Sequence, residues 1–198
     1  MTQAIRPLPP GPVRPVRANR IILVVAGALF VLLVLGVTAA VLAARSLGWS
    51  PGASTIHVIG NAMLPTVAND DYVVVQPYGQ SSPRPGDIVV MRDPYDHSRS
   101  FVKRVVAGPG QTVLMRDGEV LVDGGALDEP YVCPEPPGAL ANWPPDGRPL
   151  RLGPDQYFVL GDNRNHSADS RTFGPISRAD IVARAVHIVL PQAHARRL

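Results

Sequence analysis

The sequence has little of several features that stabilise or identify small proteins. Cys133 is the one cysteine among 198 residues, so no disulfide can form within the chain. Aromatic residues make up 6% of the composition, and the body of the chain has no lysine- and arginine-rich run with interleaved aromatics. A nucleic-acid-binding function is therefore not expected. No segment after residue 46 keeps an apolar period of about 3.6 residues, so helices there should be few and short.

Proline and glycine are abundant, with 22 and 18 residues, and both disfavour helix interiors. Short runs rich in β-branched residues alternate with clusters of Gly, Pro, Asn and Asp, which is typical of strands joined by turns. These runs include TIHVIG, DYVVVQ, GDIVVMR, FVKRVVAG, TVLMRDGEVLVDG, YFVLGD and IVARAVHIVL. They predict an all-β domain with mostly antiparallel pairing, including a hairpin that turns at Asp117 and Gly118.

One long apolar segment precedes these strands. Residues 21–44 carry no charge and lie between Arg20 and Arg45. At about 1.5 Å per residue, a helix of this length measures roughly 36 Å and can cross a hydrocarbon core of about 30 Å. A cleavable signal peptide is the alternative, but its apolar stretch is usually about 7–15 residues long. We interpret the segment as a retained, single transmembrane helix.

The distribution of arginine predicts the orientation of this helix. Four arginines precede it and one follows it directly, which places the N-terminus in the cytoplasm by the positive-inside rule. The β domain would then be extracytoplasmic, anchored to the plasma membrane. The expected parts are a disordered, basic and proline-rich cytoplasmic tail (1–20), the transmembrane helix (21–44), a linker (45–55), the β domain (56–192) with a proline-rich surface insertion (133–150), and a C-terminal tail (193–198).

Three stretches combine polar or constrained residues with strand-forming ones: GNAMLPTVANDDYVVV from residue 60, FVKRVVAGPG from residue 101 and VLGDNRNHSADSRTFGPI from residue 159. In this order and spacing, and together with PGDIVVM, VLVDGGALDEPYV and ARAVHIVLP, they resemble the bacterial type I signal peptidases. These membrane-anchored serine proteases use a Ser/Lys dyad to remove signal peptides from exported preproteins. The resemblance covers nearly the whole chain after residue 20.

The first motif of that family reads Gly-x-Ser-Met-x-Pro-Thr. Gly60, Met63, Pro65 and Thr66 match it, and Ala62 holds the position of the nucleophilic serine. The resemblance implies that the backbone N–H at this position still contributes to an oxyanion hole. The hydroxyl that would attack the substrate is missing.

The resemblance assigns the general base to Lys103, which needs burial to lower its pKa from about 10.4 before it can accept a proton at neutral pH. The alternative is a strand lysine that faces solvent beside Arg104. By resemblance, Ser167 orients the lysine through a hydrogen bond, and Asp169 with Arg171 holds the third stretch in place.

The resemblance also implies that a substrate binds as an added extended strand. The expected substrate-binding residues are Ile56, Val58, Gly60, Met63, Pro65 and Phe101. The expected partners are signal peptides of exported preproteins and the lipid membrane, and no metal or cofactor is implied.

Two explanations for Ala62 keep the chain an enzyme. One is an engineered serine-to-alanine substitution, although Asn69 and Gln111 also depart from the family pattern and favour a natural paralogue. The other is a substitute nucleophile, but Thr66 and Ser54 would need several ångströms of movement to reach the lysine. About 1 Å of misplacement can already cost about a hundredfold in rate.

A histidine-based site is also not expected, because no nucleophile with a suitable context accompanies His57 or His166 with Asp162. The third explanation for Ala62 is a catalytically silent homologue, a pseudoenzyme that binds signal peptides or regulates an active signal peptidase paralogue. We therefore predict a signal peptidase I homologue with little or no peptidase activity of its own. The other classes considered are an anchored, non-enzymatic β-domain binding protein and a sortase-type transpeptidase, which Cys133 disfavours by its place in a proline-rich insertion.

Overall fold

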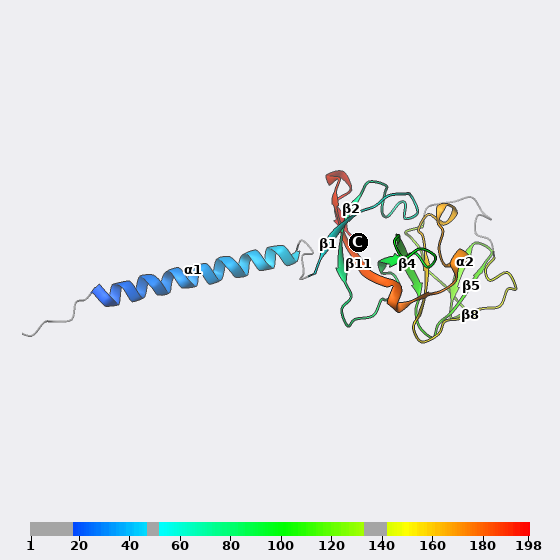
Figure 1. Cartoon of the computed structure of the whole chain (residues 1–198), viewed down its shortest axis with the longest axis horizontal. Helices are drawn as coiled ribbons and strands as arrows, with labels where there is room; N and C mark the ends of the chain where they lie inside the picture. The colour runs from blue at the N-terminus through cyan, green and yellow to red at the C-terminus, as the bar shows by residue number, and fades with distance from the viewer. Residues whose placement is uncertain (1–17, 47–51, 133–141) are drawn as a thin grey trace, which may run out of the picture. The chain divides into compact units, whose positions relative to one another are not determined.

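Figure 1 shows a computed structural model of the chain, which describes residues 18–46, 52–132 and 142–198. The chain divides into two compact units, residues 1–46 and 47–198. The first unit contains the helix α1, and the second contains all the described strands. The predicted cytoplasmic tail lies almost entirely outside the described residues.

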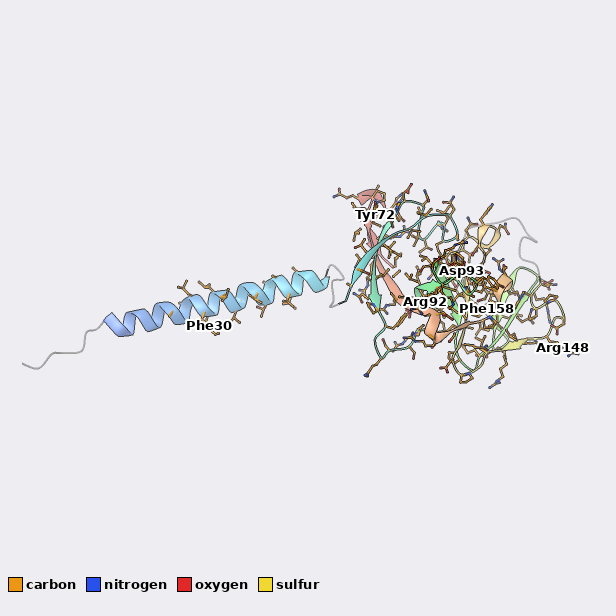
Figure 2. The ribbon with its side chains drawn as sticks, viewed as in Figure 1. Phe30, Tyr72, Arg92, Asp93, Arg148 and Phe158 are labelled. Atoms are coloured by element: carbon orange, nitrogen blue, oxygen red, sulfur yellow. The ribbon has the colours of Figure 1, made fainter. Side chains whose placement is uncertain are left out.

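α1 spans Ala18–Ser46, so it begins and ends slightly beyond the predicted segment. Its window Ala26–Ala43 has a mean hydropathy of 2.6, and none of this window is buried within the protein. Apolar side chains, among them Phe30, are exposed along this window (Figure 2). Within the described residues, α1 is the one helix whose length and composition suit a membrane crossing. A helix that is apolar all round requires an apolar environment.

The second unit is built from antiparallel strands, which confirms the predicted all-β fold. Its larger sheet has the order β1-β2-β11-β3-β4-β9-β10, and β12 pairs with β11. The strands are β1 (Ser54–His57), β2 (Tyr72–Pro77), β3 (Ile88–Arg92), β4 (Ser100–Ala107), β9 (Gln156–Leu160), β10 (Ile176–Ser177), β11 (Ile181–Leu190) and β12 (Arg196–Arg197).

A smaller sheet has the order β7-β6-β5-β8. It consists of β5 (Thr112–Arg116), β6 (Glu119–Val122), β7 (Gly125–Ala126) and β8 (Leu150–Arg151). Asp117 and Gly118 connect β5 to β6 with φ angles of 52° and 86°, as a two-residue hairpin turn requires. The predicted hairpin is therefore confirmed.

Helices in the second unit are short wherever the structure describes it, as the lack of a helical period predicted. They are η1 (Arg164–His166), α2 (Ser170–Phe173), η2 (Arg178–Asp180) and η3 (Gln192–His194). η1 and α2 follow β9 directly, so they bring the polar stretch that begins at residue 159 beside the start of β4.

The position of β4 in the core matters most for the site. Its last five residues, 103–107, are all buried, although side chains alternate between the two faces of a strand. Val102 and Val106 meet the clusters around Met63 and Phe158. Phe101 and Val105, on the face that carries Lys103, meet a third cluster that contains Val89 and Val159. Any polar side chain in this part of β4 is therefore removed from water.

The insertion predicted over 133–150 lies partly outside the described residues, as does Cys133. Most of its described residues are exposed, and its described end is anchored. Trp143 pairs with Met115 through the main chain and packs on Phe158 with ring centroids 4.6 Å apart. Residues 193–198, expected as a tail, include β12, because β3 pairs with β11 only over residues 181–184 and leaves the same edge of β11 free at His187 and Ile188.

Trp143→Ala should lower the free energy of unfolding by about 2–4 kcal/mol, because it empties space against Phe158 and the second core cluster. Tyr95→Ala is the control, since Tyr95 is 77% exposed and its loss should change stability by less than about 0.5 kcal/mol. Denaturant unfolding of both full-length variants in detergent measures the difference. Equal stability of the two variants would show that the end of the insertion is not part of the core.

Candidate active site

A groove of about 570 Å³ lies between β1 with its following loop and the beginning of β4. The lining residues are 56–63, Val90, 100–103, His166 and Ala168. Both strands have a free edge here. Among the described strands, β1 ends the sheet and pairs with β2 alone, while β9 pairs with β4 only from Arg104 onward. Unpaired strand edges of this kind can accept an extended peptide.

Lys103 lies at the floor of this groove and is 3% exposed. Its Nζ donates a hydrogen bond to the Val102 carbonyl at 3.0 Å and lies 5.1 Å from the centre of the Phe101 ring. Burial lowers the pKa of the Lys103 amine to about 8, against the opposing effect of the charges of Asp169 and Asp162. The alternative of a strand lysine facing solvent therefore does not apply.

Ala62 lines the same groove, in the loop that follows β1. Its carbonyl accepts a hydrogen bond from the Asn163 N–H at 3.1 Å, and the Asn163 side chain donates to the Asn61 carbonyl at 3.0 Å. Within the described residues, no hydrogen bond is made by the Ala62 N–H. The loop is thus fixed by its carbonyls, while a backbone donor remains available and the side chain is a methyl group.

Gly161 makes the close approach of Ala62 to the third stretch possible. A Cβ at this position would lie 2.5 Å from the Ala62 carbonyl oxygen and 2.3 Å from Ser167 Oγ. Both distances are too short for non-bonded atoms, so a side chain at position 161 would displace the Ala62 loop or Ser167.

The predicted hydrogen bond between Ser167 and Lys103 is not formed. Ser167 Oγ is buried and has no hydrogen-bond partner within the described part of the chain. It packs tightly against Gly161, while the lysine amine donates to its neighbouring carbonyl at Val102. Ser167 therefore lies beside the site, but the orienting contact expected of it is absent.

Asp169 and Arg171 form the contacts that fix the third stretch. Asp169 is fully buried and accepts hydrogen bonds from the Gly161 N–H at 3.1 Å and from Arg171 Nε at 2.8 Å. Arg171 Nη2 also donates to the carbonyl of Arg164. These bonds hold the turn after β9 closed on itself.

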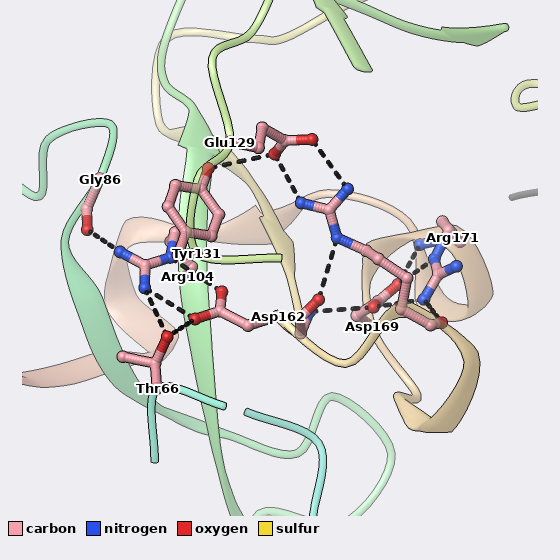
Figure 3. A network of polar contacts seen from close by, with 10 residues as sticks. Thr66, Gly86, Arg104, Glu129, Tyr131, Asp162, Asp169 and Arg171 are labelled. Atoms are coloured by element: carbon pink, nitrogen blue, oxygen red, sulfur yellow. Dashed lines mark hydrogen bonds and ion pairs between the residues drawn. The ribbon is translucent and has the colours of Figure 1, made fainter. Parts of the chain in front are cut away.

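A network of buried charges that the sequence did not suggest lies on the other face of β4 (Figure 3). Arg104 makes a two-pronged contact with Asp162 at 2.8 and 2.7 Å and donates to the Gly86 carbonyl. Thr66 donates its hydroxyl proton to the same carboxylate of Asp162. Because this hydroxyl is committed to Asp162, Thr66 is poorly suited to act as a nucleophile.

The residues after β7 complete this network. The Tyr131 ring lies over the Arg104 guanidinium at 3.8 Å, and Glu129 pairs with Arg164. Arg164 is 2% exposed and also donates from Nε to the Gly161 carbonyl at 3.0 Å. The sequence indicates this network only through Arg104, a charged residue inside an apolar strand. It does not identify Asp162 as the partner of Arg104.

Most of the predicted substrate-binding residues line the groove, namely Ile56, Val58, Gly60, Met63 and Phe101. Pro65 does not: it is exposed in the turn beyond Met63, and its carbonyl accepts a hydrogen bond from Arg196 at 3.0 Å. The prediction missed several lining residues, among them Ser100, Val102 and His166.

Neither histidine considered in the sequence contacts Asp162. His57 bonds to Asp70 at 3.0 Å and stacks on Tyr72, and His166 contacts the Asn163 side chain at 3.1 Å. Among the described residues, no group of three His, Cys, Asp or Glu side chains is placed to hold a metal ion.

Comparison with known proteins agrees with this geometry. The family model described as signal peptidase, peptidase S26, matches residues 26–190. A probable signal peptidase I-1 of Synechocystis is 38% identical over 144 residues, which cover 68% of this chain and 70% of that protein. A signal peptidase I of Leptolyngbya laminosa is 36% identical over 140 residues, covering 66% of this chain and 65% of that protein.

Among solved structures, a signal peptidase I of Enterococcus faecalis is 28% identical, with a TM-score of 0.47, and the match covers 52% of this chain and 97% of that one. The family match and the relatives together define the class of the protein. The chain belongs to the signal peptidase family, peptidase S26.

The Lys103 amine should react with an acylating reagent at a rate that rises as the pH passes through about 8. The neutral amine is the reactive form, and burial lowers the pKa at which it appears. Lys103 is the only lysine of the sequence, so peptide mass spectrometry can follow it without interference.

Arg197→Lys provides an exposed reference amine in the same molecule, which should react with a midpoint near the ordinary lysine pKa of about 10.4. Equal midpoints for the two amines would contradict the desolvation of Lys103.

Gly161→Ala should disrupt the site more than it disrupts the fold, because its Cβ would push on the Ala62 carbonyl and on Ser167. We expect a change in the environment of Lys103, seen as a shifted midpoint in the same labelling experiment. Gly108→Ala is the matched control, since its Cβ would meet only the Tyr157 ring at an ordinary 3.6 Å. An unchanged Lys103 midpoint in Gly161→Ala would rule out the tight contact.

Proposed function

We propose that this chain is a membrane-anchored signal peptidase homologue that binds the signal peptides of exported preproteins. With alanine at position 62, it has little or no peptidase activity. One observation carries the proposal. A desolvated lysine amine lines one groove with a backbone N–H that makes no hydrogen bond among the described residues, and a methyl group stands where the family has its nucleophile.

The binding part of the proposal rests on main-chain groups. The free edges of β1 and of residues 100–103 flank the groove, so an extended peptide can pair with both. The groove walls are mostly apolar and include Ile56, Val58 and Phe101, which suits small apolar side chains of a peptide. None of these contacts depends on the identity of residue 62.

The chemical part rests on the absence of an attacking atom. Lys103 is suited to accept a proton near neutral pH, and the Ala62 N–H is suited to stabilise a developing oxyanion. Acyl transfer also requires a nucleophile, and a methyl group supplies none. Thr66 is held by Asp162, so we assign no substitute.

Localisation follows from α1. The helix is long and apolar enough to cross a bilayer, and the arginines before it favour a cytoplasmic N-terminus with the β domain outside. An anchored domain of this kind would meet signal peptides at the membrane surface. A regulatory role beside an active signal peptidase paralogue is the second form of the same proposal, while a β-domain binding protein without enzymatic descent does not agree with the family match.

Restoring the hydroxyl by Ala62→Ser should generate cleavage of a preprotein in detergent or lipid, while the chain as written should cleave at least about a thousandfold more slowly. The Ala62→Ser/Lys103→Met double variant is the control, because it keeps the alcohol and removes the base. Cleavage by the chain as written at the rate of Ala62→Ser would overturn the proposed inactivity. Peptide binding without cleavage in both forms would retain the binding role and remove the enzymatic one.

A further inference from the structure

The last residues of the chain lie against the loop that carries Ala62. We call residues 192–198 the C-terminal strap, and residues 60–71, between β1 and β2, the Ala62 loop. The strap contains η3 and β12 and follows β11 without a further domain element between them. Its contacts with the loop involve charged side chains at two separate points.

Arg196 makes the first contact. Its Nη2 donates to the Pro65 carbonyl at 3.0 Å and also to the Thr66 carbonyl. A guanidinium that bonds two successive carbonyls restrains both the position and the direction of the chain. Such charge-assisted bonds are stronger than bonds between neutral groups.

His194 makes the second contact, with the carboxylate of Asp71 at 3.0 Å. Asp71 is 1% exposed, and its other oxygen accepts a hydrogen bond from the Ala68 N–H at 2.8 Å. The strap therefore holds the loop near its middle and at its end.

The strap is itself held in place by β11. Arg196 and Arg197 pair with Ile188 and His187 of β11, and the Leu198 N–H donates to the Val186 carbonyl at 2.9 Å. Leu198 also packs against the core cluster that contains Met63 and Val67. A force on the loop is therefore resisted by the main sheet.

Thr66 connects the strap to the site. Its carbonyl is bound by Arg196, and its hydroxyl is bound by Asp162. Asn163, which follows Asp162 in the chain, donates its N–H to the Ala62 carbonyl. A displaced Thr66 would thus change the place of residue 62 relative to Lys103, and about 1 Å of misplacement can cost about a hundredfold in rate.

We infer that the C-terminal strap positions the Ala62 loop beside Lys103, with Arg196 as its positioning residue. The contacts of the strap can be tested without a substrate, whereas their effect on peptides rests on the proposed function.

The first test compares Arg196→Ala with Arg197→Ala in the full chain in detergent. Both variants lose one positive charge from the same strand, but the Arg197 side chain is exposed and makes no side-chain hydrogen bond among the described residues. Hydrogen exchange of the loop amides, above all Val67 and Ala68, is the readout. Arg196→Ala should accelerate this exchange by about tenfold, and Arg197→Ala should leave it unchanged. Equal exchange in both variants would overturn the inference.

The second test uses the Ala62→Ser background. Arg196→Ala should lower kcat by about tenfold or more with a smaller change in KM, because the reacting groups are misaligned while the strand edges remain. Arg196→Lys should keep part of the rate that Arg196→Ala loses. The control variant Arg197→Ala should have the same rate as Ala62→Ser alone. A loss of rate that Arg197→Ala matches would contradict positioning by Arg196.

The two tests separate the strap from the proposed function. If Ala62→Ser fails to cleave a preprotein, the proposal that the groove is a peptidase site without its nucleophile fails. The hydrogen-exchange experiment still decides the role of the strap. If cleavage is restored and exchange is insensitive to Arg196, the strap inference alone fails.

Discussion

The burial of β4 on both faces is the constraint on which the rest of the site depends. Lys103 and Arg104 point to opposite sides of the strand, and both are buried, at 3% and 8% exposure. Arg104 is compensated by the carboxylate of Asp162 at 2.7 Å. Lys103 has no ion-pair partner within hydrogen-bonding distance among the described residues, so desolvation dominates and lowers its pKa to about 8. One strand thus carries one charge that is paired and one amine that loses its proton far more readily than an exposed lysine.

This asymmetry has a cost in stability that depends on pH. In the unfolded chain the amine has a pKa of about 10.4, so between about pH 8 and pH 10.4 the unfolded state binds more protons than the folded state. The free energy of unfolding therefore rises with pH across this window. Below it, the buried amine destabilises the fold by on the order of 3 kcal/mol. Burial of Lys103 therefore does not contribute to the stability of the fold at neutral pH.

The sequence allowed the fold class, the long apolar helix and the hairpin at Asp117 and Gly118 to be predicted, because periodicity and turn residues act locally. It also indicated Ala62 and Lys103 as members of one site through a resemblance, and the structure brings both to one groove. Contacts between distant segments were not predictable in this way. The pairing of Arg104 with Asp162 joins residues 58 positions apart, and nothing near either residue in the sequence specifies the other.

Errors arose for the same reason at the edges of the domain. A proline-rich composition predicted a surface insertion, but it did not indicate that the Trp143 ring packs on Phe158 at the end of that segment. A short polar ending predicted a tail, but free main-chain groups of β11 pair with β12. Ser167 was assigned an orienting hydrogen bond from the family pattern, and its hydroxyl instead packs against Gly161. Packing space and unpaired backbone groups are properties of the folded chain, so local sequence carries little information about them.

An alanine at position 62 bears differently on binding and on reaction. Peptide binding in this groove would use main-chain groups of β1 and β4 and apolar walls, all of which are fixed by the sheet. Reaction requires one oxygen atom at one place, next to an amine that can accept its proton. The loop that presents this place is held by Asn163, by Thr66 through Asp162, and by the strap. Because these restraints act mostly on backbone carbonyls and on Thr66, the fold of the loop does not depend on a hydroxyl at position 62.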